Sequence, residues 1–390
     1  MDLQSRKEIA RYVLSRGITE ADVEAPGPEG AEPEAPEGML AARIPAIPFP
    51  ADLAPHPAPI SPVPASSDPL PKSDVVVITW TVDEGDALAN VLTPGISRTR
   101  WHPYDRDFDS HYRPLIRGGA PSLYVNRLGS YMPTTIGQKN VLCMKSELHL
   151  NQDGKATGDG TATLPVKDFF KQIINEAKPK LFLTIGTAGS VTDAFGLGDV
   201  VVTRAARFWL GQEFRNEPFN GKTYKSEWQI PTGHFAKAEE LMLAYAAQLT
   251  QPPVGRPSPQ YGNQPPIDPP AAVIPKIRLD GRDMAAYHPI LTTDWFEYGT
   301  TSNRLDQWGS GVEMGDAALG LACHELPTHQ RPHWAVVRNM SDPVINGDLP
   351  TSEYHLNEQT TWAVGFYTAY GLYTSINGAI TTWAIIAGLD

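Results

Sequence analysis

The sequence predicts a three-layer α/β sandwich, in which a central twisted mixed β-sheet is flanked by helices. Residues 74–80 and 180–186 form short, continuous apolar runs, as strands buried on both faces do. Residues 165–177 lie between these runs, begin with a proline and carry apolar side chains at helical spacing. Buried strands separated by an amphipathic helix indicate a largely parallel or mixed sheet with helices on its faces.

The remaining elements follow from the same patterns. Residues 83–92 are expected to form a helix that ends at Pro94 and Gly95. The apolar segment 379–389 is too short to span a membrane and is expected to form a buried C-terminal helix. Further strands are expected over residues 140–150, 199–203 and 334–337 and near Ile290, and a further helix over residues 236–249.

The first 72 residues are expected to be an N-terminal extension and linker. Thirteen of the 37 prolines lie in the first seventy residues, together with eleven acidic and five basic residues. Such a composition cannot bury enough apolar surface to offset the entropy of ordering. A short helix over residues 3–16 and an unstructured tail both fit this segment. Residues 73–390 are expected to form the globular domain, with an exposed proline-rich insertion near residues 250–276.

Composition argues against several classes of function. The formal net charge is −12 and no basic cluster stands out, so nucleic-acid binding through phosphates is not expected. The two cysteines, Cys143 and Cys323, lie far apart and fit a reducing compartment, so we expect a cytoplasmic protein. The polar N-terminus lacks the apolar core of a signal peptide, and no apolar run approaches the length of a membrane span.

Candidate functional residues follow the predicted strands, because loops at the carboxyl ends of such strands meet at one edge of the sheet. Glu84 follows the first strand at the start of a helix, where a carboxylate also complements the helix dipole, as Asp83 or Asp86 would. The glycine-containing turn 186–190 follows another strand. Its glycines allow backbone N–H groups to approach a ligand closely, although a plain connecting loop has the same composition.

A second group of candidates lies further along the chain. Glu313 and Met314 are expected to lie on a short helix rich in glycine and alanine. Phe296 ends another predicted strand and is either a core aromatic or a ring on which a base stacks.

The apolar strand 334–337 leads to Arg338, Ser341 and Asp342. A solvated salt bridge is the simplest alternative for this charged pair. A carboxylic acid that donates a proton near neutral pH would instead need a desolvated pocket that raises its pKa.

In their order and spacing, these motifs resemble the nucleoside phosphorylase and methylthioadenosine/adenosylhomocysteine nucleosidase superfamily, which includes purine and uridine phosphorylases. The resemblance covers about two-thirds of the chain. It implies the α/β fold, a catalytic domain over residues 73–390, and cleavage of the bond between a ribose and a base. It further implies a small-molecule purine nucleoside or nucleotide as partner, no cofactor, and a homo-oligomer.

The resemblance also assigns roles to residues. It implies that Asp342 donates a proton to N7 of the purine and that Ser341 holds Asp342 in place. It implies that Glu84 activates the attacking water and that Arg338 helps to place it. The positions that it implies on the substrate side are Gly186, Thr187, Ala188, Gly189, Phe296, Glu313, Met314 and Asp316.

Two departures from the family pattern bear on the chemistry. Gly315 stands where the family has the Glu that grips the ribose hydroxyls, so the sugar contact is expected from Asp316, Glu313 or elsewhere. Thr184 stands where phosphorylases carry a phosphate-binding Arg, and the loop after the first strand is acidic and would repel phosphate. We therefore predict a hydrolase, with a phosphate-dependent phosphorylase and a non-catalytic nucleoside-binding module as alternatives.

Two clusters leave further possibilities open. His324, His329 and His333 lie close together, but their spacing is not a clean ligand pattern, so no metal is expected. An arginine-rich stretch would favour a 5′-phosphorylated substrate if it lined the sugar end of the site. Its members are Arg98, Arg100, Arg106, Arg113 and Arg117.

Overall fold

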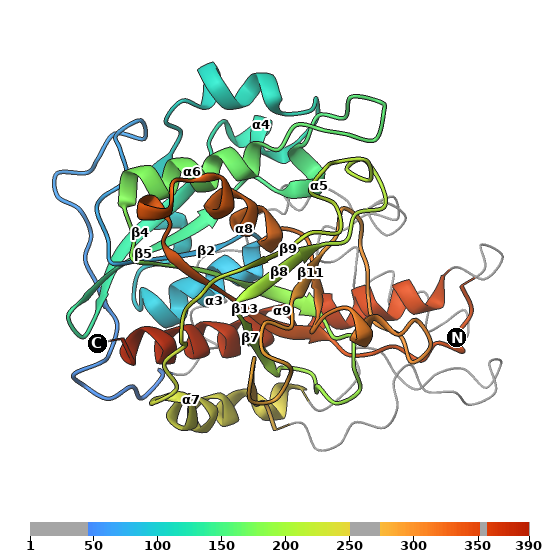
Figure 1. Ribbon diagram of the computed structural model, residues 1–390. Coiled ribbons are helices and arrows are strands. Elements are labelled where there is room, and N and C mark those ends of the chain that lie inside the picture. Colours follow the sequence, from blue (N-terminus) through green and yellow to red (C-terminus); the bar gives the residue numbers. More distant parts are fainter. Residues whose placement is uncertain (1–45, 250–273, 352–356, 390) are drawn as a thin grey trace.

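A computed structural model describes residues 46–249, 274–351 and 357–389 of the chain. The helix considered over residues 3–16 and most of the proline-rich insertion lie outside these ranges. Figure 1 shows a central sheet with helices on both of its faces. This architecture confirms the predicted α/β sandwich with a mixed sheet.

The centre of the sheet is built from parallel strands. β2 (Val75–Thr79) pairs in parallel with β5 (Lys139–Ser146) on one side and with β6 (Leu181–Gly189) on the other. β6 also pairs in parallel with β13 (His333–Asp342). Every residue of β2 is buried, as its continuous apolar sequence predicts. The carboxyl ends of these strands therefore meet at one edge of the sheet.

The mixed character of the sheet comes from its outer strands. β4 (Gly129–Ile136) is antiparallel to β5, and β7 (Val200–Thr203) is antiparallel to β13. The other strands of the described sheet are β1 (His56–Pro57), β3 (His102–Tyr104), β8 (Ala205–Phe208), β9 (Thr223–Lys225), β10 (Ile277–Leu279), β11 (Ile290–Thr292) and β12 (Val312–Glu313).

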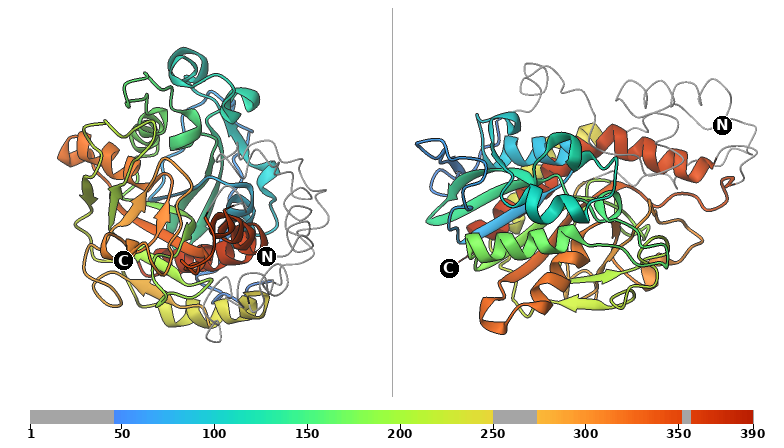
Figure 2. Two further views of the ribbon diagram at one scale, coloured as in Figure 1. Left: turned by 90° about the vertical axis from the view of Figure 1, so that its right-hand side faces the viewer. Right: turned by 90° about the horizontal axis from the view of Figure 1, so that it is seen from above.

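Two apolar layers enclose the sheet (Figures 1 and 2). α6 (Pro165–Ala177) and α8 (Asp316–Glu325) contribute to one layer. α3 (Val82–Leu92), α7 (Phe235–Met242) and α9 (Glu358–Ala387) contribute to the other. The short helices α4 (Pro121–Val125) and α5 (Leu150–Asp153) complete the α-helical segments of the described chain. No helix in the described ranges is long and apolar enough to cross a membrane.

The C-terminal helix is longer than the sequence predicts. α9 begins at Glu358, about twenty residues before the apolar segment 379–389. Polar side chains in the middle of α9 are buried and form hydrogen bonds within the protein. The Asn377 amide, for example, donates to the Gly198 carbonyl at 3.0 Å. A hydropathy pattern does not reveal such buried polar positions, because their partners come from distant segments.

The folded part also begins earlier than Ser73, the predicted boundary. β1 pairs antiparallel with β4, which extends the sheet into the segment predicted to be a linker. The indole Nε1 of Trp383 donates to the Leu53 carbonyl at 2.7 Å, and the Leu70 N–H donates to Glu176 at 2.7 Å. These contacts depend on other parts of the chain, so the proline-rich composition alone does not predict them.

The buried layer beneath α9 gives a test of the fold. Leu183 lies in β6 with none of its surface exposed, whereas Leu243 is 49% exposed. Leu183→Ala should lower the free energy of unfolding by about 2–5 kcal/mol, because it leaves a cavity. The matched control Leu243→Ala should cost less than about 1 kcal/mol. Denaturant titration measures both, and equal losses would contradict the described packing.

Candidate active site

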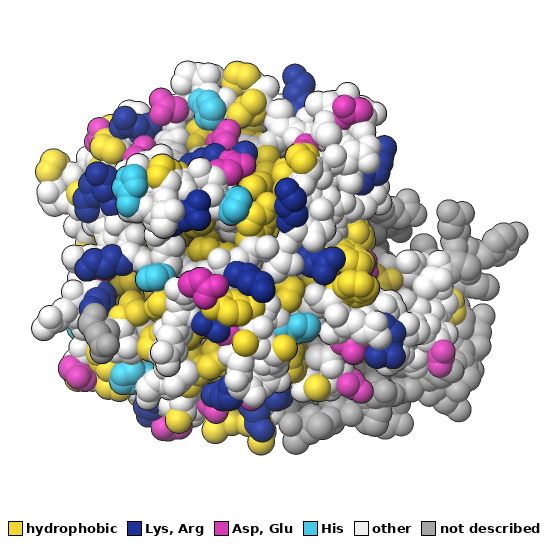
Figure 3. Space-filling model, in the orientation of Figure 1, with side chains coloured by type: hydrophobic (Ala, Val, Ile, Leu, Met, Phe, Trp, Pro, Cys, Tyr) yellow, Lys and Arg dark blue, Asp and Glu magenta, His cyan; other side chains and the backbone are white. Residues whose placement is uncertain are grey.

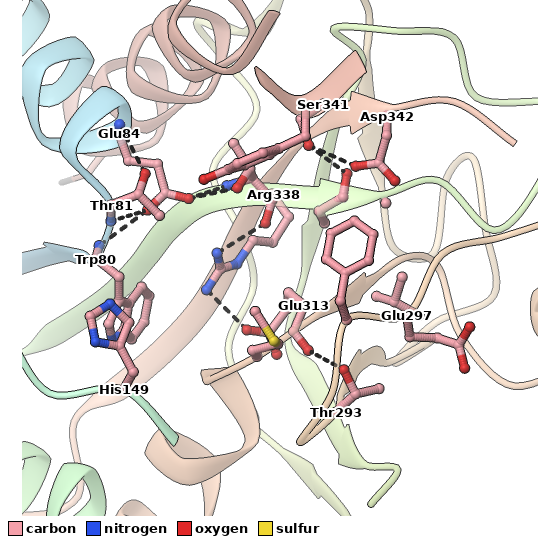
Figure 4. A pocket seen from close by; sticks show the side chains of 17 residues that line it. Trp80, Thr81, Glu84, His149, Thr293, Glu297, Glu313, Arg338, Ser341 and Asp342 are labelled. Atoms are coloured by element: carbon pink, nitrogen blue, oxygen red, sulfur yellow. Dashed lines mark hydrogen bonds and ion pairs between the residues drawn. The ribbon is translucent and has the colours of Figure 1, made fainter. Parts of the chain in front are cut away.

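A pocket opens at the sheet edge where β2, β6 and β13 end (Figure 4). It holds about 650 Å³ of empty space, open solvent at its mouth included. All the residues predicted for the site line it except Gly186 and Asp316, which contact lining side chains. The lining residues are Trp80, Thr81, Glu84, His149, Thr187, Ala188, Gly189, Thr293, Phe296, Glu297, Val312, Glu313, Met314, Arg338, Ser341, Asp342 and Tyr367.

Arg338 is a buried cation surrounded by carboxylates. Its Nε and Nη2 donate to the two oxygens of Asp316 at 2.8 and 2.7 Å, a bidentate pair. Nη2 also donates to Glu313 at 3.1 Å, and Nη1 donates to the Thr187 carbonyl at 3.1 Å. Burial alone would lower the pKa of Arg338, but the charges of Asp316 and Glu313 raise it above its usual value. Arg338 therefore remains charged at any working pH.

Glu313 does not lie on a helix, contrary to the sequence prediction. It ends β12, because Leu291 and Thr292 of β11 pair with Val312 and Glu313. The Glu313 carboxylate then accepts the first N–H of α8, that of Asp316, at 3.0 Å, so it caps the helix instead of belonging to it. Burial, followed by the charge of Asp316, raises the pKa of Glu313 to about 8 although Arg338 opposes the shift. Glu313 is therefore a weaker acid than Glu84.

Glu84 both caps helix α3 and lines the pocket. Its Oε2 accepts the backbone N–H groups of Trp80 and Thr81 at 3.1 and 3.0 Å. Its own backbone N–H donates to the Thr81 hydroxyl, so Thr81 and Glu84 form a capping box at the start of α3. Its Oε1 accepts both the N–H and the hydroxyl of Thr187 at 2.7 Å. Burial raises the pKa of Glu84, but Arg338 and these hydrogen bonds outweigh burial and lower it. Glu84 is thus an anion.

The glycine turn brings these groups together at close range. A Cβ atom on Gly186 would lie 2.7 Å from Oε1 of Glu84, and one on Gly189 would lie 2.7 Å from Oδ2 of Asp342. A side chain at either position would displace a carboxyl group, so only glycine allows this approach.

Asp342 differs from Glu313, which pairs with Arg338, and from Glu84, whose pKa Arg338 lowers, because no cation pairs with it in the described chain. Figure 4 shows it on the side of the pocket away from Glu84. Oδ1 accepts the Ser341 hydroxyl at 2.9 Å, and Oδ2 is buried without a hydrogen-bond partner among the described residues. Burial raises the pKa of Asp342 to about 7, against the smaller lowering effect of the Ser341 hydrogen bond. Ser341 and Asp342 form the end of β13 rather than a loop after it.

Several pocket residues were not identified from the sequence. Trp80 and Thr81 directly follow β2, and His149 follows the end of β5, so the rule that placed Glu84 could have found them. Glu297 follows Phe296, and burial raises the pKa of its carboxyl group. Tyr367 comes from α9 and has no local sequence signal, because only the tertiary fold brings that helix to the pocket.

The arginine-rich stretch does not line this pocket. Arg98 pairs with Asp86, and Arg117 pairs with Glu213, both at 3.0 Å. On the face shown in Figure 3, basic and acidic side chains are interspersed. Within the described ranges, no group of three or more His, Cys, Asp and Glu side chains is arranged to hold a metal ion.

No family model matches the sequence, and no curated protein matches it. Solved structures with a similar fold include futalosine hydrolase of Helicobacter pylori, at 11% identity and a TM-score of 0.43, covering 81% of this chain and 97% of that one. Methylthioadenosine/adenosylhomocysteine nucleosidase from H. pylori matches at 11% and 0.44, with 82% and 99% covered. The corresponding nucleosidase from S. pneumoniae matches at 14% and 0.42, with 81% and 99% covered. At these identities the similarity concerns the fold alone.

Proposed function

We propose that the protein is a nucleosidase that hydrolyses the N-glycosidic bond of a purine nucleoside. The observation that carries this proposal is the contrast between two acids of one pocket. Asp342 has a raised pKa and a free oxygen, whereas Glu84 is anionic and lies beside Arg338. Two acids whose pKa values are pushed apart provide a proton donor and an anionic partner in one site.

Asp342 is the proposed general acid. A purine leaves far more readily as a neutral base than as an anion, so protonation at N7 lowers the barrier. A positioned general acid contributes about 10²–10⁴-fold to such a step. Ser341 is the proposed positioning residue, since its hydroxyl occupies Oδ1 and leaves Oδ2 for the substrate.

The sugar develops positive charge as the base departs, and anionic Glu84 stabilises that charge. Glu84 is also the proposed acceptor for the proton of the attacking water. Its oxygens already accept several hydrogen bonds, so the Thr187 hydroxyl has to rotate and release a lone pair for this step. Arg338 uses four of its five N–H groups on Asp316, Glu313 and Thr187, which leaves one Nη1 hydrogen to orient the water.

Water is favoured over phosphate as the nucleophile. Among the residues that line the pocket, Arg338 is the one arginine, and its N–H groups already donate to Asp316 and Glu313. Phosphate entering beside Glu84 would meet another anion and no free bidentate arginine. The same acidic surroundings favour an uncharged nucleoside over a nucleotide.

The direct test is release of free base from a panel of purine nucleosides and nucleotides, with and without inorganic phosphate. We expect free base without phosphate, and a loss of at least about 100-fold in Asp342→Asn, which cannot donate the proton. Asp348→Asn, at an exposed aspartate, is the matched control and should retain activity. Strict dependence on phosphate would indicate a phosphorylase, and nucleoside binding without base release would indicate a binding module.

The pH dependence follows from the pKa of Asp342. The protonated carboxyl group is the active form, so base release should fall as pH rises through about 7. The Ser341 hydrogen bond lowers this pKa, so Ser341→Ala should move the alkaline limb of the kcat/KM profile to higher pH. If the alkaline limb of Ser341→Ala stays at the wild-type pH, the limb does not report the titration of Asp342.

Glu84→Gln tests the anionic partner. Turnover should fall at least about 100-fold, and the protein should lose stability because an amide cannot accept all the N–H groups that the carboxylate accepts. Thr81→Ala removes the other half of the capping box and should cost about 1 kcal/mol without a comparable loss of turnover. Base release and denaturant titration are measured on both variants. Near-wild-type turnover of Glu84→Gln would refute its role.

A further inference from the structure

A second hollow lies at β8, beside the outer strand β9 (Figure 1). It holds about 500 Å³ of empty space, open solvent included. The residues that line it are Arg207, Trp209, Leu210, Asn220 and Gly221. None of them lines the active-site pocket, so the hollow is separate from the proposed chemistry.

Arg207 is a half-buried cation that meets no acid in this hollow. Its Nε is buried without a hydrogen-bond partner among the described residues, and no acidic side chain is among the residues that line the hollow. Other arginines of this region are paired: Arg204 with Asp280 at 3.1 Å, and Arg304 with Asp306 at 3.4 Å. Because charges withdrawn from water are normally paired, the surroundings of Arg207 favour an added anion.

Two tryptophans hold the guanidinium group in place. Cζ of Arg207 lies 5.5 Å from the centre of the Trp209 ring and 5.2 Å from that of Trp308. The two rings lie 5.4 Å apart, with their planes inclined at 36°. Such contacts orient an arginine without neutralising its charge. Trp308 is also 44% exposed, so an indole ring lies open to solvent next to the cation.

The wall of the hollow opposite Arg207 in the sequence order is fixed by hydrogen bonds. The Asn220 side chain accepts the N–H of Leu210 and donates to the Leu210 carbonyl, both at 3.0 Å. The Gly221 N–H donates to the Phe208 carbonyl at 3.0 Å. These bonds occupy the polar groups of the wall, which leaves Arg207 as the polar group that a ligand can pair with. A wall that is already ordered also lowers the entropy cost of binding.

We infer that this hollow binds a small planar molecule that carries a carboxylate or phosphate group. The anionic group pairs with the guanidinium of Arg207, whose planar fork suits both kinds of oxyanion, and the ring of the ligand stacks on Trp308. A neutral ring would leave the cation unpaired, and a cationic ring would be repelled by it. The formal net charge of the chain is −12, which disfavours unspecific binding of anions. The inference does not depend on the proposed function.

The test titrates benzoate and phenyl phosphate separately into the full chain, with its tryptophans labelled with ¹⁵N. Indole N–H signals are followed by NMR, and the Trp308 signal is the one missing from Trp308→Phe. At least one of the two anions should shift the Trp308 signal and bind at least about 10-fold more tightly than neutral benzyl alcohol, the scale of a charge-assisted hydrogen bond. The two titrations distinguish a carboxylate from a phosphate site.

Variants locate the binding. Arg207→Gln should weaken binding of the aromatic anion at least about 10-fold, whereas Arg207→Lys keeps the charge without the planar fork and should retain part of it. Trp308→Ala, followed through the Trp209 signal, should weaken the aromatic anion more than acetate or inorganic phosphate. Arg100→Gln, at an exposed arginine outside the hollow, is the matched control and should bind like the wild-type protein.

Three results would overturn the inference. The first is a Trp308 signal that responds to neither aromatic anion, as it would if a second copy of the chain covered the hollow. The second is equal binding of benzyl alcohol, which would make the hollow a merely apolar surface. The third is unchanged affinity in Arg207→Gln, which would place the anion elsewhere.

Discussion

The pocket depends on the burial of one guanidinium group among carboxylates. Arg338 projects from β13 and binds Asp316 at the start of α8 and Glu313 at the end of β12, and its Nη1 reaches the Thr187 carbonyl of β6. A buried charge is stable only when it is paired, so each of these elements is held in register with the others. Removing the cation would leave Asp316 and Glu84 as uncompensated buried anions, a defect of about 3–5 kcal/mol.

This single cation also creates the chemical asymmetry of the site. Glu84 lies within its electrostatic reach and stays ionised, whereas the desolvation of Asp342 is offset only in part, by hydrogen bonds such as that from Ser341. The two carboxyl groups therefore differ in protonation although both are buried. Gly186 and Gly189 allow this arrangement because each lies directly against one of the two acids. The sheet edge thus provides a proton donor and an anion on either side of one cavity.

Much of this arrangement could be predicted from the sequence, because strand ends of an α/β sheet converge. Apolar runs predicted the strand ends, and the family resemblance then selected Glu84, Thr187 and Asp342 at those ends. The hydrogen-bond state of each acid could not be predicted. Glu313 caps α8 from a strand because β11 pairs with its backbone, and His149 faces the pocket because Asp153 and Ser122 fix its loop. Such features depend on partners far away in the sequence, so a local sequence pattern does not predict them.

The most direct test is a crystal structure with a purine nucleoside analogue whose base is joined to the sugar through carbon, so that it cannot be cleaved. N7 should lie within hydrogen-bond distance of Oδ2 of Asp342, with the anomeric carbon beside Thr187 and Glu84. An analogue bound with its base away from Asp342, or outside this pocket, would contradict the account.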